Sequence, residues 1–169
     1  MSILMILSFP LAFLIHEMEE ILLLHKWMSA HKEDLLRRFP KLQPMILHLS
    51  SLNTKAFTIA VMEELVLLLL ATAYYLEGGP YAMEVWTALF VAFSVHLVVH
   101  VSQGIIIRGY VPGFITSILL LPYSYYGISS SCQEMDCGKL IFLGVIGFIA
   151  IAVNLLFAHW LGKKLCTYL

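Results

Sequence analysis

The chain has 169 residues, of which 60% are hydrophobic and only 12% are charged, with a net charge of -1 and a mean hydropathy of +0.88. These values exclude an ordinary soluble domain, so we expect an integral membrane protein with a single domain over residues 1–169. The average charge hides a strong segregation of the charged residues along the chain.

Five stretches are apolar and long enough to be helices that cross a hydrocarbon core about 30 Å thick. The first has no positively charged start and extends as far as Trp27, so we expect it to be retained rather than cleaved as a signal peptide. The fourth is short, contains Pro112 and Pro122, and ends in tyrosines that suit a membrane interface. The sequence therefore predicts an all-α polytopic membrane helix bundle with transmembrane helices at about 3–27, 56–76, 81–107, 111–128 and 139–161.

The basic residues indicate how this bundle is oriented. Every lysine and arginine except Lys139 falls around the connection between spans one and two, between spans three and four, or after span five. Basic residues collect on the cytoplasmic side of short loops, which predicts an N-terminus outside and a cytoplasmic C-terminus. Residues 29–54 are amphipathic and should lie in the cytoplasmic interface, either as a solvated basic loop or as a site for lipid headgroups.

Cys132 and Cys137 fall in the loop between spans four and five, which this orientation places outside. Disulfides persist in oxidising surroundings, so these two residues are candidates for a disulfide, whereas Cys166 should be a free thiol on the reducing side. Two thiols with no nearby histidine make an incomplete zinc set, which argues against a metal site in this loop.

Two pairs of adjacent glutamates lie inside otherwise apolar spans, together with three histidines. An acidic side chain at membrane depth costs at least roughly 2.5–3.5 kcal/mol, and such residues usually face the bundle interior and mark function. We therefore expect these seven residues to form one site, and we assign them as candidate metal ligands: His16, Glu19, Glu20, Glu63, Glu64, His96 and His100.

The depths of these residues agree. At about 1.5 Å per residue, Glu20, Glu63 and His100 lie roughly 10 Å from the predicted cytoplasmic face. His16 and His96 lie roughly 16 Å deep, so three helices bring acids and imidazoles to one layer. His25, His31 and His48 lie at or outside the interface, and we expect them to take no part.

The angular positions agree as well, because a helix turns by about 100° per residue. His16, Glu19 and Glu20 share one stripe of the first span, and Glu17 lies at its margin. The third span presents a polar face that consists of His96, His100 and Gln103.

Glu63 and Glu64 diverge by about 100°, so we expect different roles for them, one as a ligand and the other as a supporting or acid–base group. Both are candidate catalytic residues. Asn154 and His159 of the fifth span do not share a face, and we expect them, like Gln103, to have at most a supporting role around the ligands.

Imidazoles and carboxylates that converge from several helices build metal sites in bundles, including dinuclear sites. These ligands suit iron, manganese or zinc. Four ionised glutamates balance the charge of two divalent ions, whereas one ion leaves negative charge in a low dielectric, so we expect two ions. The structural alternative is that histidine and glutamate side chains only hydrogen-bond across helices.

Residues 16–20 read H-x-x-E-E, and the chain resembles the HXXEE family of small polytopic membrane proteins, whose activity is unsettled. The resemblance implies a membrane domain of several helices over nearly the whole chain, with His16, Glu19 and Glu20 as motif residues, and no activity comes with it. The Glu63-Glu64 pair is similar to that of glutamate-dependent CAAX-type intramembrane proteases, but Leu68 stands where their motif requires arginine.

The leading functional hypothesis is a membrane-embedded, metal-dependent enzyme that acts on a lipid or other apolar substrate, by hydrolysis or by oxidation. The alternatives are a divalent-metal or proton transporter, a metal-free glutamate and histidine hydrolase, and an accessory subunit. Against transport, the titratable side chains all lie in one half of the bundle and no inverted repeat is visible. We expect membrane lipids as partners, no nucleic acid, and a multi-pass location, in the cell membrane.

Overall fold

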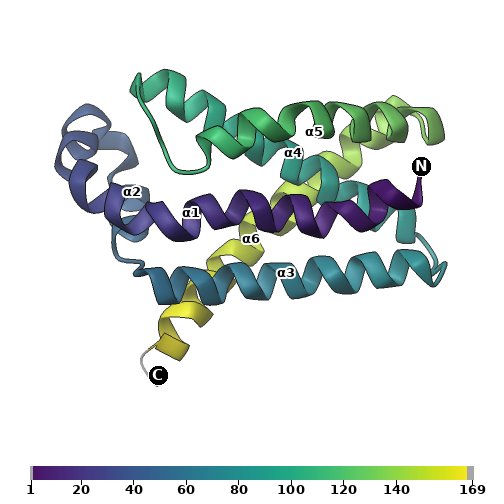
Figure 1. Cartoon of the computed structure of the whole chain (residues 1–169), viewed down its shortest axis with the longest axis horizontal. Helices are drawn as coiled ribbons and strands as arrows, with labels where there is room; N and C mark the ends of the chain where they lie inside the picture. The colour runs from purple at the N-terminus through teal and green to yellow at the C-terminus, as the bar shows by residue number, and fades with distance from the viewer. Residues whose placement is uncertain (1, 167–169) are drawn as a thin grey trace.

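Helices make up almost the whole molecule. The computed structural model describes residues 2–166, and this part of the chain forms six α-helices and no strand, which confirms the all-α prediction. The elements, labelled in Figure 1, are α1 (Ile3–Arg38), a 3₁₀ turn η1 (Pro40–Leu42), α2 (Gln43–Ser50), α3 (Thr54–Leu76), α4 (Ala82–Ile107), α5 (Phe114–Glu134) and α6 (Cys137–Cys166).

The long helices lie side by side in a bundle. In Figure 1, α1 runs lengthwise between α3 and α5, and α6 crosses them obliquely. Helix α4 packs against both α5 and α6, and α3 packs against both α1 and α6. The short α2 folds back against the far end of α1. This arrangement brings the inner faces of α1, α3 and α4 together.

Local sequence signals explain where the helices begin and end. The side chains of Ser2 and Asn53 cap α1 and α3 by accepting hydrogen bonds from backbone N–H groups three residues on, at 3.3 and 2.8 Å. Helix α4 ends at Ile107 and is capped by Arg108, whose φ of 60° is left-handed, and Gly113, with φ 84°, precedes α5. Pro112 lies between them and favours an extended preceding residue, so the chain forms a loop there.

Several predicted boundaries differ from the structure. Helix α1 continues past residue 27 to Arg38, so the first third of the amphipathic segment 29–54 prolongs the first span. Residues 111–113 belong to the loop, and α5 continues to Glu134 with Pro122 inside it. The segment after residue 128 is therefore helical as far as Glu134, and in it the hydroxyls of Ser130 and Ser131 donate to the carbonyls four residues before them.

Three described helices are long and apolar enough to cross a membrane: α3, α4 and α6. Helix α1 falls short because Glu17, Glu19 and Glu20 follow one another closely, and α5 falls short because of its prolines, serines and tyrosines. It stays a prediction that α1 and α5 cross the membrane. The sides of the membrane on which the two termini lie are also still a prediction.

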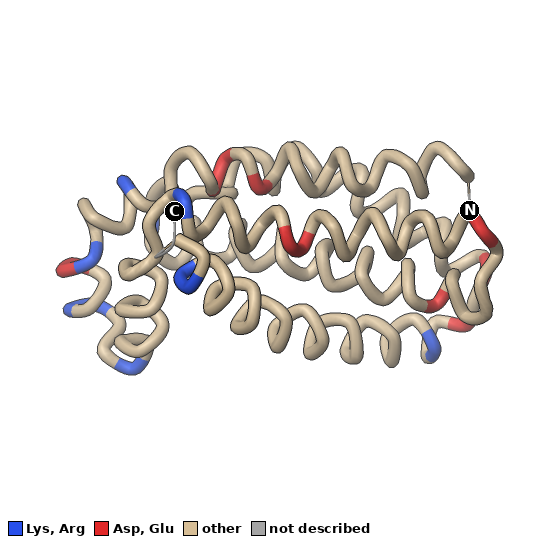
Figure 2. The backbone as a smooth tube through the Cα atoms, turned by 90° about the horizontal axis from the view of Figure 1, so that it is seen from below, with Lys and Arg blue, Asp and Glu red and all other residues tan. Residues whose placement is uncertain are grey.

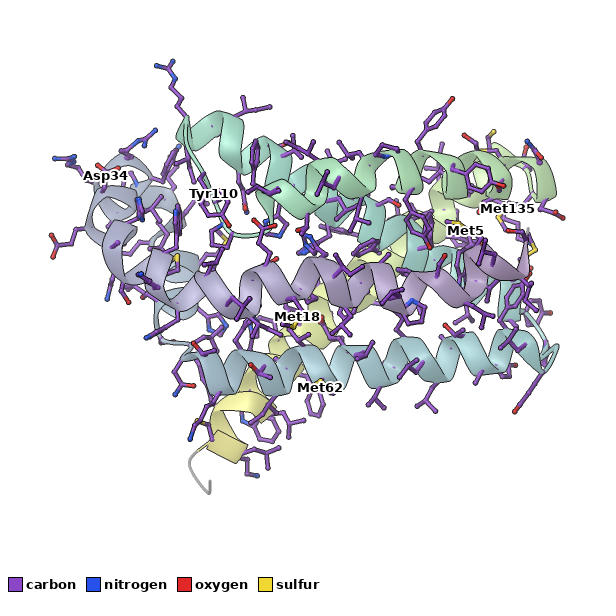
Figure 3. The ribbon with its side chains drawn as sticks, viewed as in Figure 1. Met5, Met18, Asp34, Met62, Tyr110 and Met135 are labelled. Atoms are coloured by element: carbon purple, nitrogen blue, oxygen red, sulfur yellow. The ribbon has the colours of Figure 1, made fainter. Side chains whose placement is uncertain are left out.

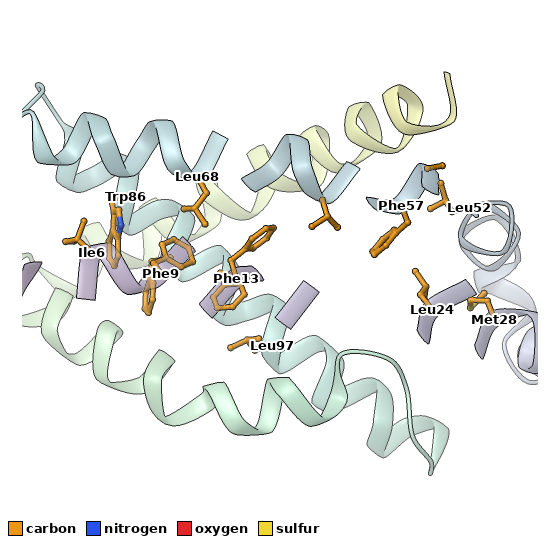
Figure 4. Close-up of a cluster of buried hydrophobic side chains, with 14 of the residues drawn as sticks. Ile6, Phe9, Phe13, Leu24, Met28, Leu52, Phe57, Leu68, Trp86 and Leu97 are labelled. Carbon is orange, nitrogen blue, oxygen red and sulfur yellow. The ribbon is translucent and has the colours of Figure 1, made fainter. Parts of the chain in front are cut away.

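Apolar side chains on either side of the α1 glutamates hold the bundle together. On one side, Phe9 of α1 packs edge-on against Phe90 of α4 with ring centroids 5.1 Å apart, and Trp86 stacks on Phe90 at 5.0 Å. On the other side, Leu24 of α1 and Phe57 of α3 belong to the buried cluster that Figure 4 shows. The polar residues of α1 thus lie between two apolar packing layers.

The charged residues are segregated in space as in sequence. Figure 2 shows lysines and arginines gathered at the end of the molecule that holds α2 and the C-terminal end of α6. Glutamates lie part-way along the bundle. Lys139 lies at the opposite end, where its Nζ is 2.8 Å from Glu84 Oε1.

Cys132 lies in the last turns of α5 and Cys137 begins α6. Both are free thiols in the structure, and they lie close enough to affect each other's ionisation. The disulfide between them therefore is not formed here, although the short turn that joins the helices keeps the two residues close. Cys166 is also a free thiol, and its Sγ lies 3.5 Å from Asn53 Nδ2.

Candidate metal centre

Four side chains converge between α1 and α4. His16 and Glu20 come from α1, His96 and His100 come from α4, and one ligand atom from each lies within 4.8 Å of all the others. Residues four apart lie over one another on a helix, so each helix contributes one vertical pair. We call these four residues the HEHH cluster.

The distances inside the HEHH cluster are short. Glu20 Oε1 lies 2.8 Å from His100 Nε2, 3.4 Å from His96 Nε2 and 3.5 Å from His16 Nε2. The Nε2 atoms of His96 and His100 are 3.1 Å apart. In a tetrahedral site with bonds of about 2.0 Å, ligand atoms are about 3.3 Å from each other. The cluster thus has close to the spacing that a divalent ion requires.

The cluster is mostly enclosed. His16 has no accessible surface, and Glu20 and His100 are buried. His96 differs, because 40% of its side-chain surface is accessible. Its neighbours Val95 and Val99 on the same helix are exposed apolar residues. The way into the cluster therefore passes the His96 ring and an apolar surface.

The environment of His16 defines which of its nitrogens faces the cluster. Thr116 Oγ1 donates to Glu19 Oε2 at 2.6 Å, and the same hydroxyl lies 3.0 Å from His16 Nδ1. A hydroxyl has one hydrogen to give, so it must accept from Nδ1–H. The lone pair of His16 Nε2 then faces Glu20 Oε1 at 3.5 Å, with no hydrogen between the two atoms. A cation between two such acceptors would stabilise both.

Glu19 lies outside the HEHH cluster, although the sequence predicts it as a ligand. Its carboxylate accepts hydrogen bonds from Tyr110 Oη (2.6 Å) and from the Thr116 hydroxyl and backbone N–H (2.6 and 2.8 Å). The backbone N–H of Ile115 adds a longer contact of 3.4 Å. Glu19 thus binds the first turn of α5, where free N–H groups favour an anion.

His100 is held from behind by the α4–α5 loop. A Cβ added to Gly113 would lie 2.8 Å from His100 Nδ1, so only glycine lets the loop come this close. The Nδ1 atom of His100 is buried and makes no hydrogen bond with a described residue. Histidines that bind metals usually donate their second N–H to an oxygen. Thr116 gives His16 this support, whereas the loop supports His100 by close packing at Gly113.

The glutamates of α3 lie beside the cluster and outside it. Asn154 of α6 donates to Glu63 Oε2 at 3.0 Å and also interacts with Glu64. Glu64 Oε1 is buried and has no hydrogen bond within the described chain. The charge of Glu64 acts on both Glu17 and Glu20, so it faces the inner side of α1.

The sequence did not lead us to place Glu17 at the site. The structure buries this carboxylate to 5% exposure and places its Oε1 3.8 Å from His96 Nε2. Glu17, at the edge of the polar stripe of α1, therefore also points into the bundle, because α1 faces α3 as well as α4. The sequence contains the information that could have identified Glu17, because a third acidic residue in the same predicted span has the same high cost of burial in lipid as Glu19 and Glu20.

The remaining predicted residues lie apart. Gln103 makes no hydrogen bond with any described residue, and Asn154 acts through the α3 glutamates. His159 is buried, and its Nδ1 lies 3.0 Å from Nε2 of His48, a residue expected to take no part. Burial, and after it the charge of Lys163, lower the pKa of His48.

Comparison with known proteins supports the resemblance seen in the sequence. Residues 7–127 match the model of a family described as a protein of unknown function with HXXEE motif, and this stretch contains the whole HEHH cluster. No curated protein and no solved structure matches the chain. Since the matched residues make up well over half of the sequence, the chain belongs to the HXXEE-motif family.

Proposed function

We propose that this protein is a membrane metalloenzyme whose HEHH cluster binds a divalent metal ion and whose substrate is a lipid or another apolar molecule. The observation that carries the proposal is the convergence of three imidazole Nε2 atoms and one carboxylate oxygen at metal-site spacing. Two of these atoms, His16 Nε2 and Glu20 Oε1, face each other at 3.5 Å with no hydrogen between them.

The charges near the cluster support a second ion. Glu17, Glu20 and Glu64 bring three carboxylates into one buried region, where one divalent ion leaves a net negative charge if all three are ionised. We propose that Glu17 and Glu64 hold a second ion beside the first. Imidazole with carboxylate suits zinc, iron or manganese.

Different residues of the chain would take different chemical roles. A metal in the cluster would supply Lewis acidity, or redox chemistry if it is iron. Glu63 is tied to Asn154, whereas Glu64 Oε1 has no hydrogen bond and is open to accept a proton. We therefore assign Oε1 of Glu64 as the acid–base group and leave the other oxygen of this carboxylate for the second ion, a choice that the sequence leaves open.

The exposed surface supports an apolar substrate. Helix α1 carries an exposed stripe of large apolar residues, which lipid tails would cover: Leu4, Leu7, Leu11, Ile15 and Leu22. The exposed edge of His96 lies beside Val95 and Val99, so a molecule that arrives through the hydrocarbon reaches the cluster first at His96.

The packing on the other side of the cluster argues against an ion pathway. Toward the N-terminal end of α1, the cluster is followed by Phe13, Phe9 and Phe93, which are buried and pack on one another. An ion that crosses the bundle would need polar side chains in this layer. A site with one entrance fits an enzyme better than a transporter.

Turnover of lipids by the purified protein tests the proposal. The protein is incubated in vesicles of a natural lipid extract, and the products are followed by mass spectrometry. Glu64→Gln should retain metal in the HEHH cluster and lose most of its activity, while Glu77→Gln, at the exposed end of the same helix, should stay active. Full activity of Glu64→Gln would contradict the assigned role.

A further inference from the structure

A second site lies beside the metal centre, at the basic end of the molecule. A cleft of about 340 Å³ separates the last turns of α1 from the loop that follows α4. Figure 3 labels Tyr110 and Asp34, which lie along it. The polar groups that line the cleft include His31, Asp34, Arg38, Arg108 and Tyr110, and Trp27 contributes an aromatic wall.

The charge of this cleft is positive. Asp34 is its one acid, and its carboxylate is already paired with Arg37 at 2.6 Å and Arg38 at 3.5 Å. Arg38 is held in place by the Ile107 carbonyl, to which it donates at 3.2 Å. Arg108 has no ion pair or hydrogen bond through its side chain with any residue from 2 to 166. One guanidinium group is therefore available for an anion.

His31 adds a further polar group. Its ring stacks on Trp27 with centroids 4.5 Å apart and an angle of 17°. Its Nδ1 lies 2.8 Å from the Trp27 carbonyl, which can only accept, so Nδ1 donates and Nε2 remains for a ligand. A protonated imidazole beside a phosphate group would donate from this nitrogen.

The cleft is connected to the metal centre. Tyr110, which lines the cleft, donates to Glu19 at 2.6 Å, and Glu19 is the residue before Glu20 of the HEHH cluster. A ligand in the cleft would therefore be linked to His16 of the cluster through the hydrogen bonds of Tyr110, Glu19 and Thr116. The predicted cytoplasmic interface, where lipid headgroups reside, is at this same basic end.

We propose that this cleft binds the phosphate group of a phospholipid headgroup, with Arg108 and Arg38 as its cationic contacts and His31 as a third. Guanidinium groups match the geometry of phosphate oxygens, and Trp27 suits the level of the headgroups. The inference rests on the proposed function in that the lipid held here would be the substrate of the HEHH cluster, with its headgroup fixed beside Glu19.

Binding of a short-chain lipid tests the proposal. Protein in a neutral detergent is titrated calorimetrically with dihexanoyl phosphatidic acid. Arg108→Asn should weaken binding by about tenfold or more, the effect of losing one charge-assisted hydrogen bond. Asparagine tolerates the left-handed backbone of this position, so the variant should keep the fold. Lys55→Gln removes one exposed charge at the same end and should change binding by less than about twofold.

Equal losses in Arg108→Asn and Lys55→Gln, or no loss in either, would overturn the proposal, because general surface charge would then explain the binding. Competition identifies the source of the phosphate. Glycerol phosphate that displaces the lipid at similar concentrations makes a soluble phosphate ester the ligand, and a much weaker effect makes the lipid the ligand. Both results support a phosphate site.

The test separates this inference from the metal proposal. Glu20→Gln should lose metal and still bind dihexanoyl phosphatidic acid, whereas Arg108→Asn should keep the metal content of the wild type. Lipid binding that depends on Arg108 in a protein without metal would sink the metalloenzyme and leave the phosphate site standing. A protein that binds metal but whose lipid binding does not depend on Arg108 would contradict the phosphate site and leave the metal proposal standing.

Discussion

Thr116 connects the HEHH cluster to α5 through a single hydroxyl group. This group donates to Glu19 and accepts from His16, and so determines that the free lone pair of His16 is on Nε2. The hydroxyl can be removed with little change of volume, which makes Thr116 the position where the geometry of the cluster is most simply tested.

Thr116→Val should lower metal affinity about 10–100-fold, the usual effect of losing a partner that orients a ligand. The reason is that His16 would no longer be held in one tautomer. Affinity is measured by competition with a chelator. Thr58→Val serves as the control, because Thr58 is half-buried away from the cluster residues and its hydroxyl bonds only to the Thr54 carbonyl of its own helix. Unchanged affinity in Thr116→Val would show that this network does not position His16.

The spacing of single residues predicts part of the site and misses another part. The separation of four between His16 and Glu20, and between His96 and His100, is visible in the sequence, and the depth argument brings the two pairs together. The direction of Glu19 is not visible, because its partner Thr116 is 97 residues away and lies on a helix whose start was predicted three residues too early.

At the level of helices, the short α4–α5 loop determines how closely α5 approaches the centre. Gly113 has a φ of 84° and lies against His100, so any side chain there meets both a strained backbone and the imidazole ring. Hydropathy alone could not show this contact. It depends on the left-handed conformations at Arg108 and Gly113, which turn the chain back toward α1.

Gly113→Ala should destabilise the protein by about 1–2 kcal/mol, the cost of a left-handed conformation for a residue with a Cβ. It should also weaken metal binding by displacing His100. Thermal unfolding with and without added metal measures both effects. Gly109→Ala in the same loop is the control, since a Cβ there meets no atom within 4 Å. If Gly109→Ala and Gly113→Ala behave alike, the loop does not support His100 as described.

For the molecule as a whole, composition predicts the helical bundle well, and the structure agrees in fold class and in the ends of α3 and α4 to within two residues. Hydropathy supports membrane spans for α3, α4 and α6. It cannot do so for α1, because the acids that build the site are the same residues that lower its hydropathy. The acids of this region thus lower the hydropathy of the helix that carries them, and hydropathy gives no support for α1 as a span.

The sidedness of the bundle leads to a labelling prediction. Cys132 and Cys137 lie where α5 gives way to α6, close in the chain to Lys139, and Cys166 is the last residue of α6, whose C-terminal end lies with the other basic residues. In sealed cells treated with a mild reductant, an impermeant maleimide should label Cys132 and Cys137 and spare Cys166, because basic residues stay in the cytoplasm. Single-cysteine variants identify the labelled position. Labelling of Cys166 alone would reverse the orientation.

The most direct measurement is elemental analysis of the protein purified in mild detergent without a histidine tag, beside Glu20→Gln, Glu64→Gln and the exposed control Glu77→Gln. We predict two divalent ions per chain in the wild type and in Glu77→Gln, one in Glu64→Gln and none in Glu20→Gln. A Glu20→Gln protein that retains the metal content of the wild type, or a wild-type protein that binds no metal in any preparation, would contradict the assignment of the HEHH cluster as a metal centre.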